Sequence, residues 1–117
     1  MRADYSQIEL RIVARLSGDA RMQRAYRKGE DLHRLTAALV TGKAIADVSE
    51  EDRRLAKAIN FGLIYGMGAA KLQSYAETKY GVTLSLEQAK AFRKRFFEAY
   101  AGVAEWHETI KRSYSEE

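Results

Sequence analysis

Cysteine and proline are both missing from the 117-residue sequence. Without cysteine the chain can form neither a disulfide framework nor a thiolate metal site, and this fits a reducing compartment. Without proline every residue keeps its backbone N–H, as expected for a nearly all-helical chain with short connections. No apolar run approaches the length of a membrane-spanning helix, so we expect no membrane partner.

A strong excess of charge of one sign is also missing. Lysine and arginine total 20 and aspartate and glutamate total 16, which leaves a net charge of +4. This mild excess permits a polyanionic partner but does not require one. The length suits one domain. The apolar fraction leans on alanine, so we expect some apolar surface to be buried against another part of a larger assembly.

Capping residues, apolar stripes and glycine stops predict a mainly α fold built from consecutive helices. Residues 2–5 could form the end of one short strand, and Ser6 with Glu9 would then cap the first helix. Asp19 and Asp31 are expected to cap the second and third helices. The expected helices cover residues 6–18, 20–28, 32–40, 49–66, 69–80, 85–100 and 103–114.

The stretch 49–66 is the most informative part of the sequence. Ser49 and Asp52 form a capping box at its start, and Gly66 can end the helix in the left-handed conformation. At about 100° per residue, one face of this helix is apolar and should point to the core. That core face carries Leu55, Ile59, Gly62 and Leu63.

A second row of side chains follows the other side of this helix, each four residues after the last. It consists of Arg53, Lys57, Phe61 and Tyr65. The two cations could bind phosphates and the two rings could stack on a sugar or a base, so the row fits a nucleotide. An ordinary exposed face, with its rings packed on neighbouring domains, explains the row equally well.

Asp4 lies where the expected strand would pass into the first helix. An exposed carboxylate at such a place suits a hard cation such as Mg²⁺, and the backbone carbonyl of Tyr5 could add a second oxygen ligand. A single aspartate before a helix is more commonly a turn residue or a cap, so spacing alone favours that alternative.

Two segments resemble the motifs of a known enzyme family. Residues 4–11, DYSQIELR, resemble motif A of the family A DNA polymerases, the bacterial DNA polymerase I group. Residues 53–66, RRLAKAINFGLIYG, resemble motif B of the same family, its nucleotide-binding fingers helix. The order and separation of the motifs also match, as does the DLH at residues 31–33, and the similarity covers essentially the whole chain. The resemblance implies a helical fingers subdomain over residues 19–117, preceded by a palm-derived segment over residues 1–18.

The resemblance also implies a role for each matching residue. Asp4 would be one of two carboxylates that hold two catalytic Mg²⁺ ions, with the Tyr5 carbonyl as a further ligand. Lys57 would act as general acid to the leaving pyrophosphate. Glu9, steadied by Tyr65, would fill the space beside the sugar C2′. The incoming deoxynucleoside triphosphate (dNTP) would lie near Gln7, Glu9, His33, Arg53, Lys57, Phe61 and Tyr65. Primer–template contacts would involve Arg54, Asn60, Tyr65 and Gly66.

The partners that the resemblance implies are dNTP, primer–template DNA, and the remaining palm and thumb of a larger polymerase. It also implies a bacterial cytoplasmic location at the nucleoid. The sequence ends at Glu117, before the region that would supply the second catalytic carboxylate, so we expect the isolated chain to be inactive. Ala101 stands where relatives often have proline, and this would soften the bend or stop expected at Ala101–Gly102.

Two other functions fit the residues alone. One is a non-catalytic basic helical module that binds nucleic acid by charge, and the other is a purely structural helical domain. The basic run at residues 90–95 is usually a solvated face, although it could face DNA. We expect Trp106 to pack in the interior and His107 to be an exposed helix residue.

Overall fold

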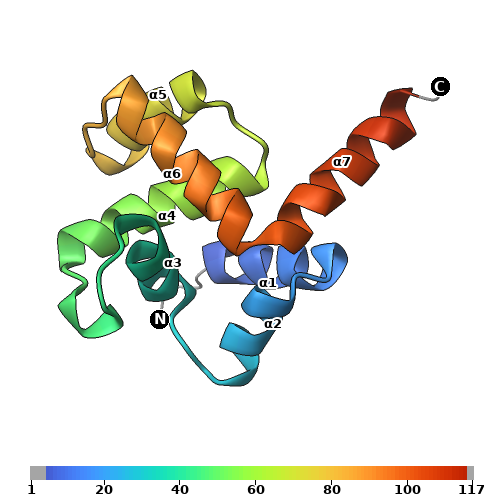
Figure 1. The fold of residues 1–117 in the computed structure, drawn as a ribbon, viewed down its shortest axis with the longest axis horizontal. Helices are drawn as coiled ribbons and strands as arrows, with labels where there is room; N and C mark the ends of the chain where they lie inside the picture. Colours follow the sequence, from blue (N-terminus) through green and yellow to red (C-terminus); the bar gives the residue numbers. More distant parts are fainter. Residues whose placement is uncertain (1–4, 116–117) are drawn as a thin grey trace.

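The computed structural model describes residues 5–115, with side chains from Ile8 to Arg112. Seven α-helices and one short 3-10 turn follow one another, and the described residues contain no strand (Figure 1). The mainly α prediction is therefore confirmed. Residues 2–4 of the expected strand lie outside the described residues, whereas Tyr5 already belongs to the first helix, so Ser6 is not its cap. The elements are α1 (Tyr5–Ser17), α2 (Ala20–Arg27), α3 (Leu32–Thr41), η1 (Ile45–Asp47), α4 (Glu50–Ile64), α5 (Ala69–Tyr80), α6 (Leu86–Ala99) and α7 (Ala101–Ser115).

Capping boxes start two of the longest helices, as the sequence predicts. Ser49 Oγ accepts a hydrogen bond from the Asp52 amide at 3.0 Å, while Asp52 Oδ2 accepts one from the Ser49 amide at 3.1 Å. Ser85 and Gln88 form the same reciprocal pair at the start of α6, at 3.0 and 2.9 Å. Each box satisfies amides that have no acceptor inside the helix, so α4 and α6 begin where the sequence places them.

Asp19 caps two helices at once, which the sequence did not predict. Its Oδ1 accepts a hydrogen bond from the Met22 amide at 2.9 Å, and its Oδ2 accepts one from the Gly102 amide at 2.8 Å. A Cβ at position 102 would lie 2.6 Å from the Asp19 Cα, so only glycine fits there without movement of the backbone. α7 consequently begins at Ala101, two residues before its expected start. Of the expected bend or stop at Ala101–Gly102, the break between the two helices is present, but it falls at Tyr100, and no helix stops at Gly102.

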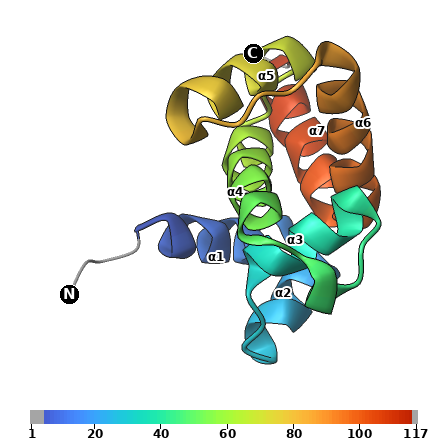
Figure 2. The ribbon, with the colours of Figure 1, turned by 90° about the vertical axis from the view of Figure 1, so that its left-hand side faces the viewer.

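α4 lies at the centre of the molecule, with α3, α5 and α6 packed around it (Figure 1, Figure 2). α1 and α2 lie together, and α7 packs on α1 near its own start before projecting away from the other helices. α6 and α7 diverge from their joint at Tyr100 and Ala101. α4 and α5 approach closely at Gly62, because a Cβ there would lie 2.8 Å from the Leu72 Cδ1.

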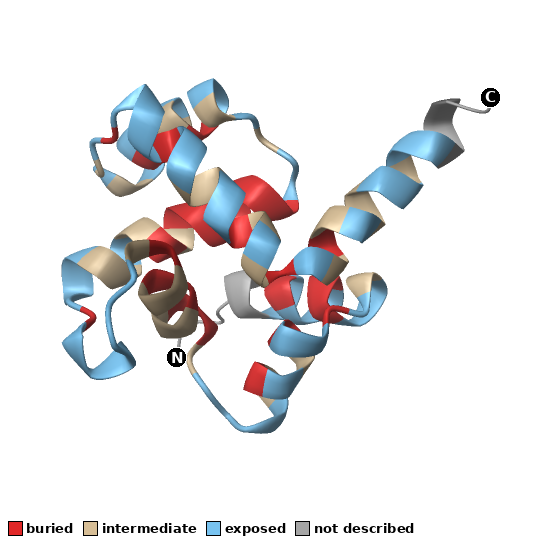
Figure 3. Cartoon of the chain, viewed as in Figure 1, coloured by how far each residue is buried: buried red, intermediate tan, exposed pale blue. Residues whose placement is uncertain are grey.

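Figure 3 shows buried residues in the second half of α4, on α3 and where α1 meets α7. Ile59, Leu63, Phe96 and Tyr100 are completely buried in one cluster. α1 is different, because only one residue of its four-residue apolar stripe is buried. Val13 lies in the core, whereas the other three, Ile8, Ile12 and Leu16, are exposed. No helix in the described part of the chain combines the length and apolar character that crossing a bilayer requires.

Candidate functional site

The candidate site is built along α4, whose first half carries two cations on one side. Both Arg53 and Lys57 are partly buried. The Arg53 Nε donates a hydrogen bond to Asp31 Oδ2 at 2.8 Å, and these side chains are 25% and 33% exposed. Asp31 Oδ1 meanwhile accepts from the amides of His33 and Arg34 at 3.0 and 3.4 Å, which starts α3. One carboxylate therefore joins the start of α3 to the first cation of the row.

The charge state of Asp31 follows from this arrangement. Partial burial raises the pKa of its carboxyl, but the hydrogen bond and charge of Arg53 and the two amides outweigh burial and hold the pKa below 3.8. The pair is thus fully charged at neutral pH. An arginine side chain has five N–H donors, and the four on the terminal nitrogens are those that a phosphate would use in a bidentate contact.

Phe61 does not form part of an open row. Its side chain is 5% exposed, and its ring lies 5.7 Å from the His33 ring in a tilted arrangement. α3 packs against α4 at this point and covers the ring, an effect that residue spacing on a single helix does not reveal. The expected column of four accessible groups is therefore wrong at its third member.

His33 and Asn60 are also fully buried, and their side chains form part of a polar network. The Asn60 side-chain nitrogen lies 2.9 Å from His33 Nδ1, and Asn60 Oδ1 accepts from the Thr36 hydroxyl at 2.9 Å. That hydroxyl lies 2.7 Å from the Tyr100 hydroxyl, whose pKa is raised by burial. The network joins α3, α4 and the end of α6. His33 or Asn60 would therefore reach a bound nucleotide or DNA only if α3 moved relative to α4.

At the other end of α4, Tyr65 is 63% exposed. Its hydroxyl hydrogen-bonds the Glu9 carboxylate on α1, and partial burial followed by this carboxylate raises the pKa of Tyr65. Gly66 has φ +79° and donates its amide to the Leu63 carbonyl at 3.0 Å, which ends the helix as predicted. The structure thus brings Glu9 and Tyr65 together, although their part in nucleotide binding stays a prediction.

The remaining predicted residues are less informative. Arg54 is exposed and faces a hollow between the start of α4 and the start of α6. Asp4 lies outside the described residues, as do the side chains of Tyr5 and Gln7. Within the described part of the chain, no three histidine or acidic side chains gather as a metal site.

Comparison with known proteins decides the family. The model of DNA polymerase family A matches residues 1–117. The chain belongs to DNA polymerase family A. It is 49% identical over 114 residues to DNA polymerase I of Aquifex aeolicus, and 44% identical over 115 residues to DNA polymerase I of Pseudomonas aeruginosa. These matches cover 97% and 98% of this chain but only 20% and 12% of the two relatives.

A solved structure agrees with this assignment. The polymerase domain of Pol1 from M. smegmatis, in complex with DNA primer-template and dNTP, is similar with a TM-score of 0.79 and 35% identity. The match covers 97% of this family A chain and 19% of that domain. The all-helical arrangement is thus one part of a much larger polymerase fold. Family A polymerases use divalent metal ions, but the described residues alone do not make a metal site.

Two residues of this family A chain that contact the α4 region escaped sequence reasoning. His107, expected to be exposed, is half-buried, and its Nε2 donates to the Ile64 carbonyl at 2.9 Å. His107 lies four residues after Val103, on the apolar face of α7, and this spacing already indicates that its side chain is turned toward the interior. Thr36 likewise stands between Leu32 and Val40 on a buried face, where a polar residue indicates an internal hydrogen bond.

Proposed function

We propose that this chain is the nucleotide-binding fingers part of a DNA-directed DNA polymerase, and that it binds the incoming dNTP along α4. Residues 1–18 would be derived from the palm and residues 19–117 would form the fingers. The enzyme would work with primer–template DNA, completed by its remaining palm and thumb, in the bacterial cytoplasm at the nucleoid. The chain spans a fifth or less of its DNA polymerase I relatives, so it supplies only part of the machinery.

One observation carries this proposal: two cations lie at the start of α4, and the contact between Tyr65 and Glu9 of α1 lies at its end. Arg53 and Lys57 are one turn apart at the start of α4, which suits a triphosphate. Glu9 and Tyr65 meet at its other end, where a sugar and base would lie. The similar M. smegmatis polymerase domain holds both DNA primer-template and dNTP, which supports the same partners here.

The proposed roles divide between this chain and the rest of the enzyme. Lys57 would donate a proton to the leaving pyrophosphate, and Glu9 would exclude a 2′-hydroxyl. Asp4 and the Tyr5 carbonyl would supply one side of a Mg²⁺ site, whose further carboxylates would come from the rest of the polymerase. The ions would there activate the primer 3′-hydroxyl and stabilise the leaving group. As long as α3 covers Phe61, His33 and Asn60, these residues would support the nucleotide site through packing and would not contact the nucleotide.

A titration with dNTP and Mg²⁺, followed by the amide NMR signals of α4, tests the triphosphate contact. Loss of a charge-assisted hydrogen bond costs about 1.5–3 kcal/mol, so Arg53→Ala should weaken binding at least about tenfold. Arg27→Ala removes the same charge from the exposed end of α2 and is the matched control. Equal affinity in the Arg53→Ala variant and the parent chain would remove the phosphate-binding argument.

Asp31→Asn tests the same triphosphate contact, but here binding should become stronger. Asparagine caps a helix about as well as aspartate, so α3 should stay intact while the negative charge beside Arg53 is lost. A triphosphate would then meet an unpaired guanidinium, and its affinity should rise by about threefold or more. A fall in affinity would show that the Asp31–Arg53 pair itself holds the binding geometry.

The isolated chain should not polymerise, because one predicted carboxylate cannot hold two metal ions and no thumb holds a duplex. Template-directed incorporation of dNTP by the purified chain would contradict this statement. The second candidate function, a basic nucleic-acid module, is favoured by the exposed cations of α6. It predicts steep salt dependence and no preference for triphosphate over inorganic phosphate.

A further inference from the structure

The buried polar network that joins α3, α4 and the end of α6 has a direction, because each of its hydrogen bonds allows only one donor. Its members are completely buried, where a polar group that loses its hydrogen bond costs free energy. They are His33, Thr36, Asn60 and Tyr100. Counting the hydrogens that these side chains carry decides which atom donates in each contact.

The contacts of the Thr36 hydroxyl set this direction. Asn60 Oδ1 can only accept, so the Thr36 hydroxyl, at 2.9 Å, donates its single hydrogen to it. With that hydrogen used, the Tyr100 hydroxyl must be the donor of its 2.7 Å contact with Thr36 Oγ1. Burial raises the pKa of Tyr100, so its hydroxyl keeps this hydrogen at neutral pH. The hydrogen bonds therefore run from Tyr100 through Thr36 to Asn60.

At its other end the buried polar network determines the state of the His33 ring. Asn60 Nδ2 can only donate, and it lies 2.9 Å from His33 Nδ1. Nδ1 must therefore accept and bear no hydrogen, which leaves the single ring hydrogen of a neutral imidazole on Nε2. Either the other tautomer or a protonated ring would place two N–H groups face to face between His33 and Asn60.

Reversing the whole network would not remove this conflict without cost. If the Asn60 amide were turned over, its Nδ2 would donate to Thr36 Oγ1, and the Thr36 hydroxyl would then donate to Tyr100. The Tyr100 hydrogen would lose Thr36 as its acceptor in the core, and a buried donor that loses its acceptor costs free energy. The end of α6 thus acts on a ring of α3 through three hydrogen bonds.

We propose that Asn60, Thr36 and Tyr100 are positioning residues that hold His33 as the neutral tautomer with its hydrogen on Nε2. This tautomer offers a donor to a phosphate oxygen, whereas the other would turn a lone pair toward it. A neutral ring can also be covered by α3 without burying an uncompensated charge. His33 would then pass from its covered position to a triphosphate without gaining or losing a proton. This role toward phosphate rests on the proposed function, but the tautomer does not.

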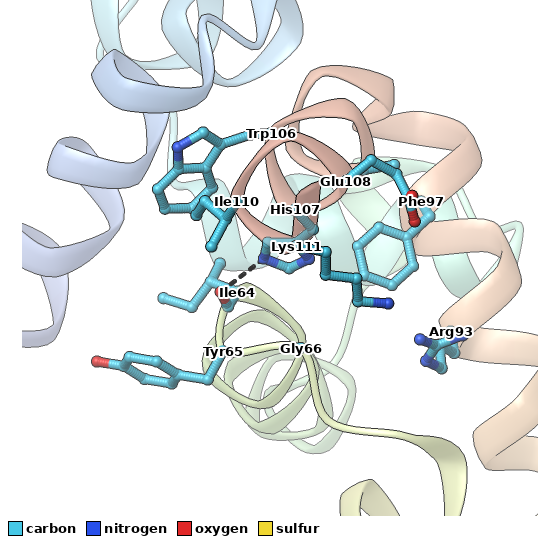
Figure 4. A pocket seen from close by; sticks show the side chains of 11 residues that line it. Ile64, Tyr65, Gly66, Arg93, Phe97, Trp106, His107, Glu108, Ile110 and Lys111 are labelled. Carbon is cyan, nitrogen blue, oxygen red and sulfur yellow. Dashed lines mark hydrogen bonds between the residues drawn. The ribbon is translucent and has the colours of Figure 1, made fainter. Parts of the chain in front are cut away.

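The second histidine of the chain provides an internal reference for the tautomer of His33. Figure 4 shows the His107 ring beside the end of α4, with its Nε2 2.9 Å from the Ile64 carbonyl oxygen. A carbonyl oxygen can only accept, so Nε2 of His107 also carries a hydrogen. This contact involves no member of the buried polar network. Changes in that network should therefore alter the His33 signals and leave those of His107 unchanged.

Long-range nitrogen–proton NMR spectra of isotope-labelled histidine, at about pH 8, show which ring nitrogen bears the hydrogen. In the parent chain we expect it on Nε2 in both histidines. Thr36→Val removes the hydroxyl that orders the Asn60 amide, so its two orientations become similar in free energy and about half of the His33 rings should carry the hydrogen on Nδ1. Thr36→Ser keeps the hydroxyl and should keep the parent tautomer.

A hydrogen on Nδ1 of His33 in the parent chain would overturn the proposal, even if Thr36→Val failed to fold. An unchanged tautomer in a folded Thr36→Val chain, or the same change in Thr36→Ser, would also overturn it. Unchanged His107 signals in each variant show that the fold is intact.

The role toward phosphate is measured by titration with dNTP and Mg²⁺. If half of the rings present the wrong tautomer, Thr36→Val should bind about twofold more weakly than Thr36→Ser. Equal affinities, with the tautomers different, would overturn that role. Failure of Arg53→Ala to weaken binding would instead remove the proposed nucleotide site and leave the tautomer result standing, so the two failures are distinguishable.

Discussion

The two halves of α4 differ sharply in their surroundings. From Ala58 to Ile64 every residue is buried, whereas from Glu50 to Lys57 only Ala56 is. The buried half packs against α3, α5 and α6, and the other half carries an ion pair and the candidate phosphate ligands. A helix can therefore present functional groups at one end because its other half is anchored by packing.

The two halves of α4 should also differ in how strongly substitutions destabilise them. Buried apolar groups lose transfer energy and leave a cavity when they are shortened. A partly exposed charge that loses its ion-pair partner is solvated by water instead, so the free energy of unfolding changes little. The chain should therefore tolerate substitutions in the first half of α4 and fail structurally on substitutions in the second.

The largest effect is expected at Ile59, which is completely buried. Ile59→Ala should reduce the free energy of unfolding by about 2–5 kcal/mol, measured by urea denaturation followed by circular dichroism. Ile12→Ala makes the same chemical change on α1, where the side chain is 48% exposed. It should change the stability by about 0.5 kcal/mol or less. Similar losses in both variants would mean that the centre of α4 does not anchor the fold.

An intermediate effect is expected in the buried polar network. Thr36→Val keeps the shape of the side chain but leaves Asn60 Oδ1 and the Tyr100 hydroxyl without the threonine hydroxyl. Unfolding should become easier by about 1–3 kcal/mol, because buried polar groups lose their partner. Thr36→Ser keeps the hydroxyl and loses one methyl group, so its cost should stay near about 0.8 kcal/mol. A valine variant as stable as the parent would show that water replaces the lost hydroxyl.

Sequence reasoning succeeded where the signal is local. The boxes at Ser49 and Ser85 join residues three apart in sequence, so the helix starts could be predicted from residue types alone. The core face of α4 was likewise readable from its periodicity, and Ile59 and Leu63 are completely buried. The family motifs gave the family, which the match over the whole chain confirms.

The failures share one cause, which is contact between residues far apart in sequence. Phe61 lies on the predicted nucleotide row, yet the packing of α3 buries it beside His33. Gly102 lies in the first turn of α7 and does not stop a helix, because the carboxylate of Asp19, 83 residues earlier in the chain, accepts a hydrogen bond from its amide. His107 is held by the Ile64 carbonyl. Helical periodicity describes the faces of one helix, but it does not say which neighbour covers each face.

The smallest effect is expected at the start of α4, where Lys43 contacts Asp52 at 2.7 Å on the surface. The hydrogen bond from Lys43, together with the Ser49 amide, lowers the pKa of Asp52 below 3.8. A lowered carboxyl pKa stabilises the fold above pH 3.8, and this contribution is lost as the pH falls through the lowered value.

Lys43→Met should therefore reduce the stability at pH 7 by about 0–1 kcal/mol, since exposed ion pairs are weak and screened by salt. The difference between variant and parent should shrink as the pH falls below 3.8 and Asp52 takes up its proton, and it should also shrink in about 1 M salt. A series of urea unfolding curves from pH 7 downward measures this difference. A loss at pH 7 as large as that of Ile59→Ala would show that the first half of α4 is also an anchor, and the two halves would no longer differ.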